Sequence, residues 1–479
     1  MTTTWAMKRK PNGTFRARIN ARGYEQIDGI HFDGSSIAAP VTNEITLRVV
    51  FVIGLMADWI FELLDVHGAF LLGLFGDEEE MFIEVPRGFE KRYERYGDVV
   101  LKLMHTIYGT KQAAMAYWRE QTRAMKDMKY KRNDIDPCLN FKWTDNGLTV
   151  WLSWVDDNIA GGKSIDVKKA VKDMEDRFDC EHLGEMNEYL GCKIEHNKEK
   201  REIKFTQPVM IQSFTDEFKI DVNKKRITPA EPRSILTPYV KSKTQKYYRS
   251  GVGKLNHMTR WSRPEIQNAV RELSRSMKGA SEAHITAMHR VMEYYTSTES
   301  RGWTLKPKRK WDGKSKDFEF EISGKADSDY AKCPVTSKSV SGYTAFLEKV
   351  PITAKSGMQK TVALSVTEAE ASAGIACAQD MLYIMKLLKS MGLKVKKPMI
   401  LKIDNKGAVD LANNWSSGGR TKNVKLNFLR DLKEGGLIKV IWIAGTDNDD
   451  DLFTKNLAGP AFNKHGSVYY GKDEYYTWE

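Results

Sequence analysis

An Asp-Asp pair directly after an apolar run limits the path that the backbone can take. Residues 149–155 read TVWLSWV, which is typical of a strand, and Asp156, Asp157 and Asn158 follow, with a Gly-Gly pair soon after. Neighbouring side chains of a strand point to opposite faces, so two adjacent aspartates converge on one site only where the backbone turns. The sequence therefore predicts a β-hairpin with the two aspartates at its tip.

A third aspartate, Asp65, ends another apolar run, WIFELLDV at residues 59–66. If this strand lies beside the hairpin, Asp65, Asp156 and Asp157 would hold two divalent cations about 3.5–4 Å apart, an arrangement that supports phosphoryl transfer. Carboxylate oxygens suit Mg²⁺, whose coordination substrate phosphates complete. An Asp-Asp pair alone is also typical of a polar turn, and that interpretation stays open at this point.

A second set of acids lies at the ends of predicted elements in the last third of the chain. Asp327 follows a predicted strand at residues 318–326, and Asp404 follows one at residues 399–403. Glu368 begins a predicted helix, and Asp451 begins a short one. The helix dipole also favours acids at helix starts, so these two have a structural alternative. The neighbouring acids that are alternatives to Asp327, Glu368 and Asp451 are Asp329, Glu370 and Asp450.

The length and composition indicate several folded domains with a basic surface. A chain of 479 residues accommodates roughly three domains. Its 75 Lys and Arg exceed its 63 Asp and Glu by 12, which favours a polyanionic partner. The five cysteines form no CxxC motif, which indicates a reducing compartment. With no signal peptide and no apolar run of bilayer length, we expect an intracellular protein, in the cytoplasm or nucleus, with no membrane partner.

The pattern of elements divides the chain. Short apolar runs alternate with helical spacing up to about residue 204, prolines break the pattern in residues 228–246, and residues 251–295 predict two or three helices. A basic stretch at residues 301–316 has the composition of a linker. Further strands are predicted at residues 341–347, 361–365 and 438–443, and helices at residues 367–391 and 406–412. The residues from about 460 have the composition of a tail.

The sequence gives less support to a zinc site or to a serine hydrolase. Cys180, His182, Cys192 and His196 are metal-type ligands, but the last two would lie about 13 Å apart on one strand, too far to share a tetrahedral zinc. No Gly-x-Ser-x-Gly motif supports a serine hydrolase.

Two ordered sets of motifs carry a family resemblance. The first set is RARINARGYEQ (16–26), LDVHGAF (64–70), FIEVPRGF (82–89), YGTKQA (108–113), WVDD (154–157) and FTQP (205–208). The second set is KADSDY (325–330), SVTEAE (365–370), IDN (403–405) and DLFTK (451–455). In this order the first set resembles the reverse transcriptase of copia-type LTR retrotransposons, and the second set resembles the ribonuclease H of the same elements.

The resemblance implies roles for individual residues. It makes Phe70 the aromatic gate that excludes a ribose 2′-hydroxyl by bulk, and Gln112 a residue that lines the nucleotide pocket. Trp154 stands where the family has Tyr. The metal-binding and catalytic residues of the polymerase would be Asp65, Asp156 and Asp157, and those of the ribonuclease H would be Asp327, Glu368, Asp404 and Asp451. The arginines in the stretch that resembles the fingers, where guanidinium groups suit triphosphate oxygens, are Arg16, Arg18 and Arg22.

The implied architecture is an α+β / α/β multidomain chain, a right-hand polymerase with fingers, palm and thumb followed by a ribonuclease H-like mixed-sheet domain. Its expected parts are fingers and palm (1–227), thumb or connection helices with the basic linker (228–316), the ribonuclease H-like domain (317–460) and a tail (461–479). We expect two Mg²⁺ (or Mn²⁺) ions in each active site. The expected partners are an RNA template, a DNA primer, an RNA–DNA hybrid and deoxynucleoside triphosphates.

The main alternative is a catalytically decayed retroelement remnant that at most binds nucleic acid. The survival of all the expected carboxylates speaks against decay. A retroviral-type integrase would need a further glutamate about a helix and a loop beyond Asp404, and the sequence around Lys439 offers none.

Overall fold

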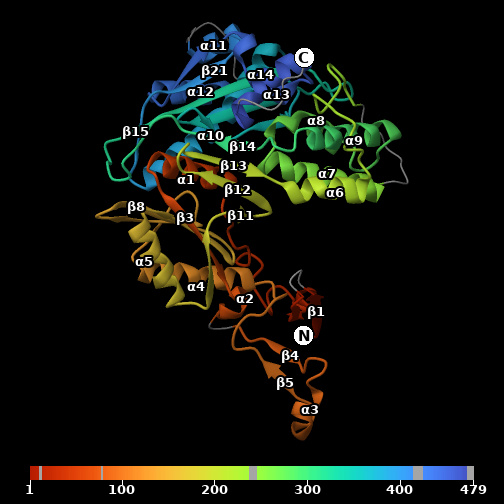
Figure 1. The fold of residues 1–479 in the computed structure, drawn as a ribbon, viewed down its shortest axis with the longest axis vertical. Helices are drawn as coiled ribbons and strands as arrows, with labels where there is room; N and C mark the ends of the chain where they lie inside the picture. Colours follow the sequence, from red (N-terminus) through yellow and green to blue (C-terminus); the bar gives the residue numbers. More distant parts are fainter. Residues whose placement is uncertain (10–12, 77–78, 237–244, 414–423, 472–479) are drawn as a thin grey trace. The chain divides into compact units, whose positions relative to one another are not determined.

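The computed structural model of the chain describes residues 1–9, 13–76, 79–236, 245–413 and 424–471 (Figure 1). They form two compact units, the first from residues 1–43 and 59–185 and the second from residues 44–58 and 186–479. The chain therefore leaves the first unit for helix α1 (Glu44–Met56), which belongs to the second, and then returns. None of the helices in the described ranges has the length and apolarity needed to cross a membrane.

A six-stranded sheet with the order β10-β3-β9-β8-β7-β6 organises the first unit. On β3 (Ile60–Val66), Leu64 and Val66 are buried in a cluster with residues of helices α4 and α5, so Asp65 belongs to the opposite face. Residues 59–66 and 149–155 were both predicted as strands, and both predictions are confirmed. The remaining elements of this layer are α4 (Ala113–Asp127), β6 (Lys131–Arg132), β7 (Leu139–Thr144), β8 (Gly147–Trp154), β9 (Asp157–Gly162), α5 (Ser164–Glu175) and β10 (Cys180–Glu185).

Two smaller hairpins complete the first unit. The backbone N–H of Ala21, at the end of β2, donates to the carbonyl oxygen of Tyr108 at 2.8 Å. Gly109 permits this approach, since a Cβ there would lie 2.1 Å from the Ala21 oxygen and the φ of Gly109 is +93°. The contact fixes β2 beside residues 108–109. The elements outside the main sheet are β1 (Thr3–Arg9), β2 (Phe15–Ala21), α2 (Ala69–Leu72), β4 (Phe82–Glu84), α3 (Glu90–Tyr93) and β5 (Val100–Lys102).

In the second unit, α1 packs as a buried helix beside a four-stranded sheet, β11-β12-β13-β14. Its Arg48 donates to the carbonyl oxygen of Ile352 at 2.9 Å and stacks 3.8 Å from the ring centroid of Trp303. The expected linker at residues 301–316 is therefore wrong in part, because it contains strand β14 (Trp303–Leu305) with Trp303 buried. The other strands are β11 (Glu188–Tyr189), β12 (Cys192–Asn197) and β13 (Glu202–Thr206).

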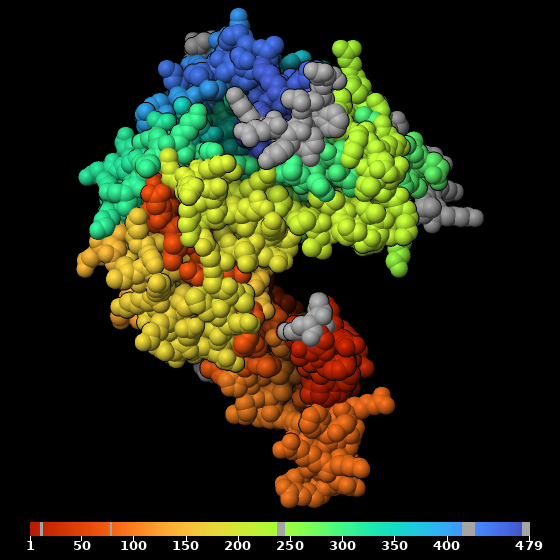
Figure 2. Space-filling model, viewed as in Figure 1, coloured from red at the N-terminus to blue at the C-terminus, as the bar shows by residue number. Residues whose placement is uncertain are grey.

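Among the described residues, four α-helices lie between β13 and β14 in the chain, and three of them confirm the two or three helices predicted for residues 251–295. The four helices are α6 (Pro208–Phe218), α7 (Gln245–Trp261), α8 (Gln267–Ser274) and α9 (Glu282–Ser297). Helix α8 contacts both α13 and β19 of the mixed sheet described next. In the space-filling view the green surface of these helices is continuous with the blue-green surface of that part of the same unit (Figure 2).

The mixed sheet has the order β18-β17-β16-β21-β22, with β19 also paired to β17. Strands β16, β21 and β22 are parallel to one another, so their carboxyl ends meet at one edge. Helix α10 lies close against β16, because a Cβ on Gly324 would lie 2.4 Å from the Cys377 sulfur. The strands of this sheet are β16 (Ile322–Asp329), β17 (Val340–Leu347), β18 (Val350–Pro351), β19 (Lys355–Met358), β21 (Met399–Ile403) and β22 (Ile438–Trp442). β15 (Glu319–Phe320) and β20 (Lys394–Val395) form a separate parallel pair. The helices of this part are α10 (Val366–Ser390), α11 (Lys406–Asn413), α12 (Val424–Glu434), α13 (Asp451–Thr454) and α14 (Gly459–Tyr470).

Two sequence expectations in this unit are wrong. Residues 361–365 form no strand, and Leu364 is 88% exposed; the added strand is β19, six residues earlier. The expected tail begins as helix α14, which buries Phe462 and Tyr469 against the rest of the unit. Apolar residues at helical spacing, rather than position in the chain, decide its structure. Residues 472–479 lie outside the described ranges.

Candidate active sites

The Asp-Asp pair lies at the tip of the hairpin between β8 and β9. Trp154 is paired with Asp157 across the hairpin, so Val155 and Asp156 form a two-residue turn. Val155 has a φ of +56°, which is uncommon for a β-branched residue and allows this tight reversal. The sequence prediction of a hairpin tip is confirmed.

The sheet register brings Asp65 beside this turn. Asp65 on β3 lies directly opposite Asp157 on β9, and directly opposed residues of antiparallel strands place their side chains on one face. The backbone N–H of Val66 donates to the carbonyl oxygen of Asp156 at 3.1 Å, so the turn itself is fixed at the end of β3. All three predicted carboxylates of the first unit therefore gather at one end of the sheet.

Their charges interact. Burial, reinforced by the negative charges of Asp156 and Asp65, raises the pKa of Asp157 to about 6. Burial and Asp156 also raise the pKa of Asp65, while His67 and Arg18 oppose the rise. A group of half-buried acids with raised pKa values favours a cation that neutralises them.

A buried asparagine holds the turn, and sequence reasoning treated it only as a turn-forming residue. Asn158 is fully buried, and its Oδ1 accepts hydrogen bonds from Gln121 Nε2 at 2.5 Å and from Trp151 Nε1 at 3.1 Å. Its Nδ2 donates to the carbonyl oxygen of Asp156 at 2.8 Å. The network connects the carboxylate turn to helix α4, so it fixes the position of the turn.

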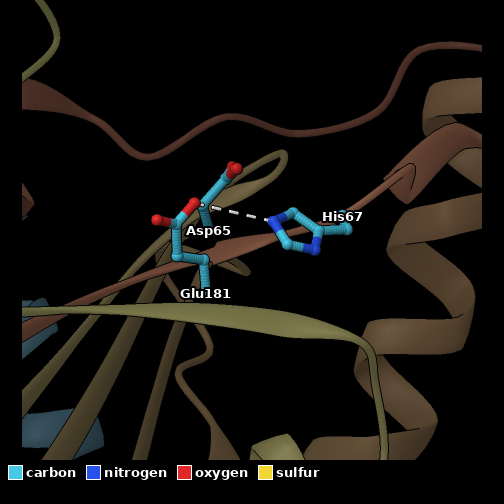
Figure 3. Close-up of side chains that lie close together, drawn as sticks. All are labelled: Asp65, His67 and Glu181. Carbon is cyan, nitrogen blue, oxygen red and sulfur yellow. Dashed lines mark ion pairs between the residues drawn. The ribbon is translucent and has the colours of Figure 1, made fainter.

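Glu181 and His67 lie beside Asp65, and the sequence analysis missed both as site residues (Figure 3). Glu181 on β10 lies opposite Asp65 on the side away from Asp157. The His67 imidazole lies 3.6 Å from Glu181 and 3.3 Å from Asp179, whose hydrogen bond raises the pKa of His67. Asp65, His67 and Glu181 each offer a ligand atom within 4.8 Å of the others. Only the strand pairing reveals this grouping, because Glu181 is far from Asp65 in the sequence.

The predicted gate residue Phe70 lies on α2, close to the carboxylates in the chain. The ring of Tyr108 contacts Phe70 edge-on, with centroids 5.3 Å apart, and Thr106 Oγ1 donates to the Phe70 carbonyl oxygen at 2.7 Å. The Arg18 guanidinium lies 4.2 Å from the centroid of the Tyr108 ring. These contacts hold β2, α2 and residues 106–108 together, with the Tyr108 ring contacting both Phe70 and Arg18.

The structure distinguishes the three predicted arginines. Arg18 is partly buried and its charge lowers the pKa of Asp65, whereas Arg16 and Arg22 are exposed. Arg18 is therefore the arginine that lies close to the carboxylates.

The Gln112 side chain is buried and hydrogen-bonded within the first unit. It is 5% exposed, accepts a hydrogen bond from Gln26 Nε2 at 2.8 Å and donates to the carbonyl oxygen of His31 at 3.2 Å. Both ends of its amide are thus used within the fold, and the side chain supports residues 26–31.

In the second unit, a buried carboxylate cluster forms at the carboxyl edge of the parallel strands. Asp327 lies near the end of β16, Asp404 directly follows β21, and Glu370 comes from the first turns of α10. Their ligand atoms all lie within 4.8 Å of one another.

The structure gathers Glu370 rather than the predicted Glu368 at this cluster. Glu370 is 3% exposed, and its Oε1 accepts hydrogen bonds from the N–H of Ser328 at 3.1 Å and from its hydroxyl at 2.9 Å. Glu368 instead accepts from the backbone N–H of Leu364 at 2.9 Å, as an acid in the first turn of α10. The helix dipole explains Glu368, as the sequence analysis allowed.

Asp451 lies beside the cluster, whereas the alternatives Asp450 and Asp329 are engaged by other side chains. The negative charge of Asp451 raises the pKa values of Asp327 and Asp404. Asp450 is fully buried and accepts a hydrogen bond from the Thr344 hydroxyl at 2.6 Å, and Asp329 pairs with Lys332 at 2.7 Å.

An ammonium group already lies within this cluster. Lys455 Nζ pairs with Asp451 and lies 3.5 Å from Asp327, while the Thr454 hydroxyl donates to Asp327. Glu370 Oε2 is buried without a hydrogen-bond partner among the described residues. Burial and the neighbouring acids raise the pKa values of both Glu370 and Asp327. An unpartnered buried carboxylate oxygen facing other carboxylates fits a divalent-cation site.

The structure also places residues of the Cys and His set for which the sequence analysis argued against a shared zinc. Cys192 and His196 are four residues apart on strand β12, as expected, and His182 pairs with Glu62 at 2.9 Å. Among the described residues, potential ligand atoms of three side chains lie within 4.8 Å of one another in two groups only. These groups are Asp65, His67 and Glu181, and Asp327, Glu370 and Asp404.

Comparison with known proteins finds a family for the first part of the chain. Residues 1–232, nearly half of the chain, match the family model described as reverse transcriptase (RNA-dependent DNA polymerase).

Two longer matches cover almost the whole chain. It is 29% identical over 468 residues to the retrovirus-related Pol polyprotein from transposon TNT 1-94 of Nicotiana tabacum, covering 94% of this chain and 34% of the relative. It is 27% identical over 474 residues to that from transposon RE1 of Arabidopsis thaliana, covering 97% of this chain and 31% of the relative. The chain is similar to these transposon Pol polyproteins over almost its whole length, as the motifs indicated, and spans about a third of the length of these relatives.

Solved structures give distant matches. The structure of a foamy viral protease-reverse transcriptase in complex with double-stranded DNA matches with a TM-score of 0.47 and 11% identity, over 92% of this chain and 65% of that chain. A second, in complex with an RNA/DNA hybrid, matches with a TM-score of 0.44 and 10% identity, over 93% and 50%.

Proposed function

We propose that the chain is an RNA-directed DNA polymerase that extends a DNA primer on an RNA template with deoxynucleoside triphosphates. The first unit would supply the palm and fingers of a right-hand polymerase, and helices α6–α9 the thumb. The observation that carries this proposal is the register pair of Asp65 and Asp157, with Asp156 in the adjoining turn.

The residues of the first unit divide the work of nucleotide addition. Two Mg²⁺ (or Mn²⁺) ions held by the three aspartates would activate the primer 3′-hydroxyl and neutralise charge on the leaving pyrophosphate. Asn158 keeps the turn in place. Phe70, held by Tyr108, would exclude a ribose 2′-hydroxyl by bulk, and Arg18 would bind phosphate oxygens.

We propose ribonuclease H activity for the second unit. Asp327, Glu370, Asp404 and Asp451 would hold two divalent cations that activate water for attack on the RNA strand of a hybrid. Ser328 orients Glu370 through two hydrogen bonds, and Thr454 orients Asp327 through one.

Primer extension tests the polymerase. The purified chain should add deoxynucleotides to a DNA primer on an RNA template with Mg²⁺ or Mn²⁺, and Asp156→Asn should lower the rate by at least about 100-fold. Asp145→Asn, which changes an exposed aspartate in the β7–β8 turn of the same sheet, is the matched control and should keep the rate. Equal, negligible incorporation by wild type and Asp156→Asn would support a decayed remnant instead.

Hybrid cleavage tests the ribonuclease H. Labelled RNA should be cut when paired with DNA and spared when paired with RNA. Asp404→Asn should stop the cutting, while Asp410→Asn, on the exposed face of α11, should not. Cleavage that survives Asp404→Asn would rule out this site.

A further inference from the structure

A lysine-rich groove lies on the mixed sheet of the second unit, on the face that α10 does not cover. Leu401 and Ile403 of β21 are buried, whereas the alternate residues Ile400 and Lys402 are partly exposed, as expected for a strand with one covered face. The groove has a volume of about 800 Å³. Its lysines are Lys325, Lys349, Lys396, Lys397, Lys402 and Lys439.

Most of these charges are not neutralised within the fold. Lys325 pairs with Asp449, and Lys396 pairs with Glu321 at 2.9 Å. Ion pairs between described residues involve none of the other four lysines.

The strand register concentrates the charge. Lys325 on β16 lies directly opposite Lys402 on β21. Asp449 pairs with Lys325, whereas Lys402 forms no ion pair with a described residue, so the fold balances only part of the charge at these two positions. A bound polyanion would balance the rest.

The groove also leads to the carboxylate cluster. Lys325 is two residues before Asp327 on β16, and Lys402 is two residues before Asp404 at the end of β21. Two residues of a strand span about 6–7 Å, and residues two apart share a face. On both strands, therefore, a lysine of the groove lies next to a carboxylate of the cluster, on its N-terminal side.

We propose that this groove binds the phosphate backbone of a nucleic-acid strand. Ile400 and Ile441 give it an apolar floor between the lysines, which suits sugars and bases as well as phosphates. A strand held there would reach the edge where Asp327 and Asp404 lie. An acidic protein segment would also match the charge, but it would not account for the alignment with the cluster. The site is separate from the carboxylates, so binding is measurable even if the chain cuts no RNA.

Equilibrium binding tests the groove. The full chain is titrated into a fluorescent single-stranded oligonucleotide and into an RNA–DNA hybrid, in EDTA so that no cleavage occurs, over a series of salt concentrations. The variant is Lys402→Gln with Lys439→Gln, and the matched control is Lys386→Gln with Lys200→Gln, two exposed lysines elsewhere in the unit.

The groove variant should bind at least about tenfold more weakly, and its log–log salt slope should fall by about 1.4 for a single strand, from the loss of two phosphate contacts. The control should change affinity by less than about twofold. Lys402→Arg with Lys439→Arg should keep the wild-type affinity and slope, which shows that lost charge, not lost folding, weakens the Gln variant.

Three results would overturn the proposal. The first is unchanged affinity in the groove variant. The second is an equal loss in the control, which would point to net charge. The third is displacement of the oligonucleotide by polyglutamate at an equal charge concentration, which would assign the groove to acidic proteins.

Discussion

Replacing Asp157 by asparagine should stabilise the metal-free protein while it abolishes polymerase activity. The pKa of Asp157 is about 6 in the folded protein against 3.8 for a free side chain, because burial and the charges of Asp156 and Asp65 disfavour ionisation. The difference of about two pH units corresponds to at most about 3 kcal/mol of folding free energy that the native carboxylate costs at pH 7, because solvent screens the charge of a half-buried group. Asparagine has the same shape and carries no such cost.

The pH dependence has a definite sign. Below about pH 3.8 the group is protonated in both the folded and the unfolded chain, so Asp157→Asn should change nothing through this group. The stabilisation should grow by about 1.4 kcal/mol per pH unit up to about pH 6 and then stay constant. At pH 5 it should be about half of its value at pH 7.

Calorimetry in EDTA measures the effect. For a unit of this size, 3 kcal/mol corresponds to a rise of about 6–12 °C in the unfolding temperature of the first unit. Asp145→Asn, the exposed control, should shift the free energy of unfolding by less than about 0.5 kcal/mol. Added Mg²⁺ should stabilise the wild type more than Asp157→Asn. A variant that is equally or less stable than wild type at pH 7, or one whose advantage grows towards pH 4, would refute the repulsion argument.

Three further changes test other contacts. Glu370→Gln should abolish hybrid cleavage and Glu368→Gln should leave it near the wild-type rate, as measured with a labelled RNA–DNA hybrid; the opposite result would restore the sequence-based choice. Tyr108→Leu should lower the preference for deoxynucleotides over ribonucleotides about 3–10-fold in single-nucleotide incorporation, because the gate loses an aromatic contact, and Tyr108→Phe should not. Arg48→Met should lower the free energy of unfolding by about 2–3 kcal/mol in urea, since it leaves the buried carbonyl oxygen of Ile352 without its donor; no change would show that the contact is dispensable.

Local patterns were enough to predict the elements that carry the carboxylates. Apolar runs predicted β3 and β8, and helical spacing predicted α10, within one or two residues at most ends. The hairpin tip followed from the geometry of two adjacent aspartates, because only a turn lets both reach one site. These inferences need no knowledge of distant contacts.

Choices between neighbouring residues depended on contacts that no local pattern contains. Glu368 and Glu370 both lie at the start of α10, and only the contact with Ser328 distinguishes them. Arg16 and Arg18 are two apart on β2, so they share a face, and only the position of Tyr108 selects Arg18. The sequence also contained no sign that α1 packs in the second unit, because the residues before and after it belong to the first unit.

The two carboxylate sites neutralise their charge in different ways, and this affects how each would take up a cation. In the second unit, Lys455 Nζ already lies between Asp327 and Asp451, so a divalent ion there must compete with a tethered ammonium group. In the first unit, the groups that lower the pKa of Asp65 are His67 and Arg18, and Asp157 has no such cation among the causes of its shift. A cation at the first site would therefore relieve repulsion directly, whereas at the second it must first displace a favourable ion pair. The carboxylates of the first unit should consequently bind Mg²⁺ more tightly, for equal numbers of carboxylates, than those of the second unit.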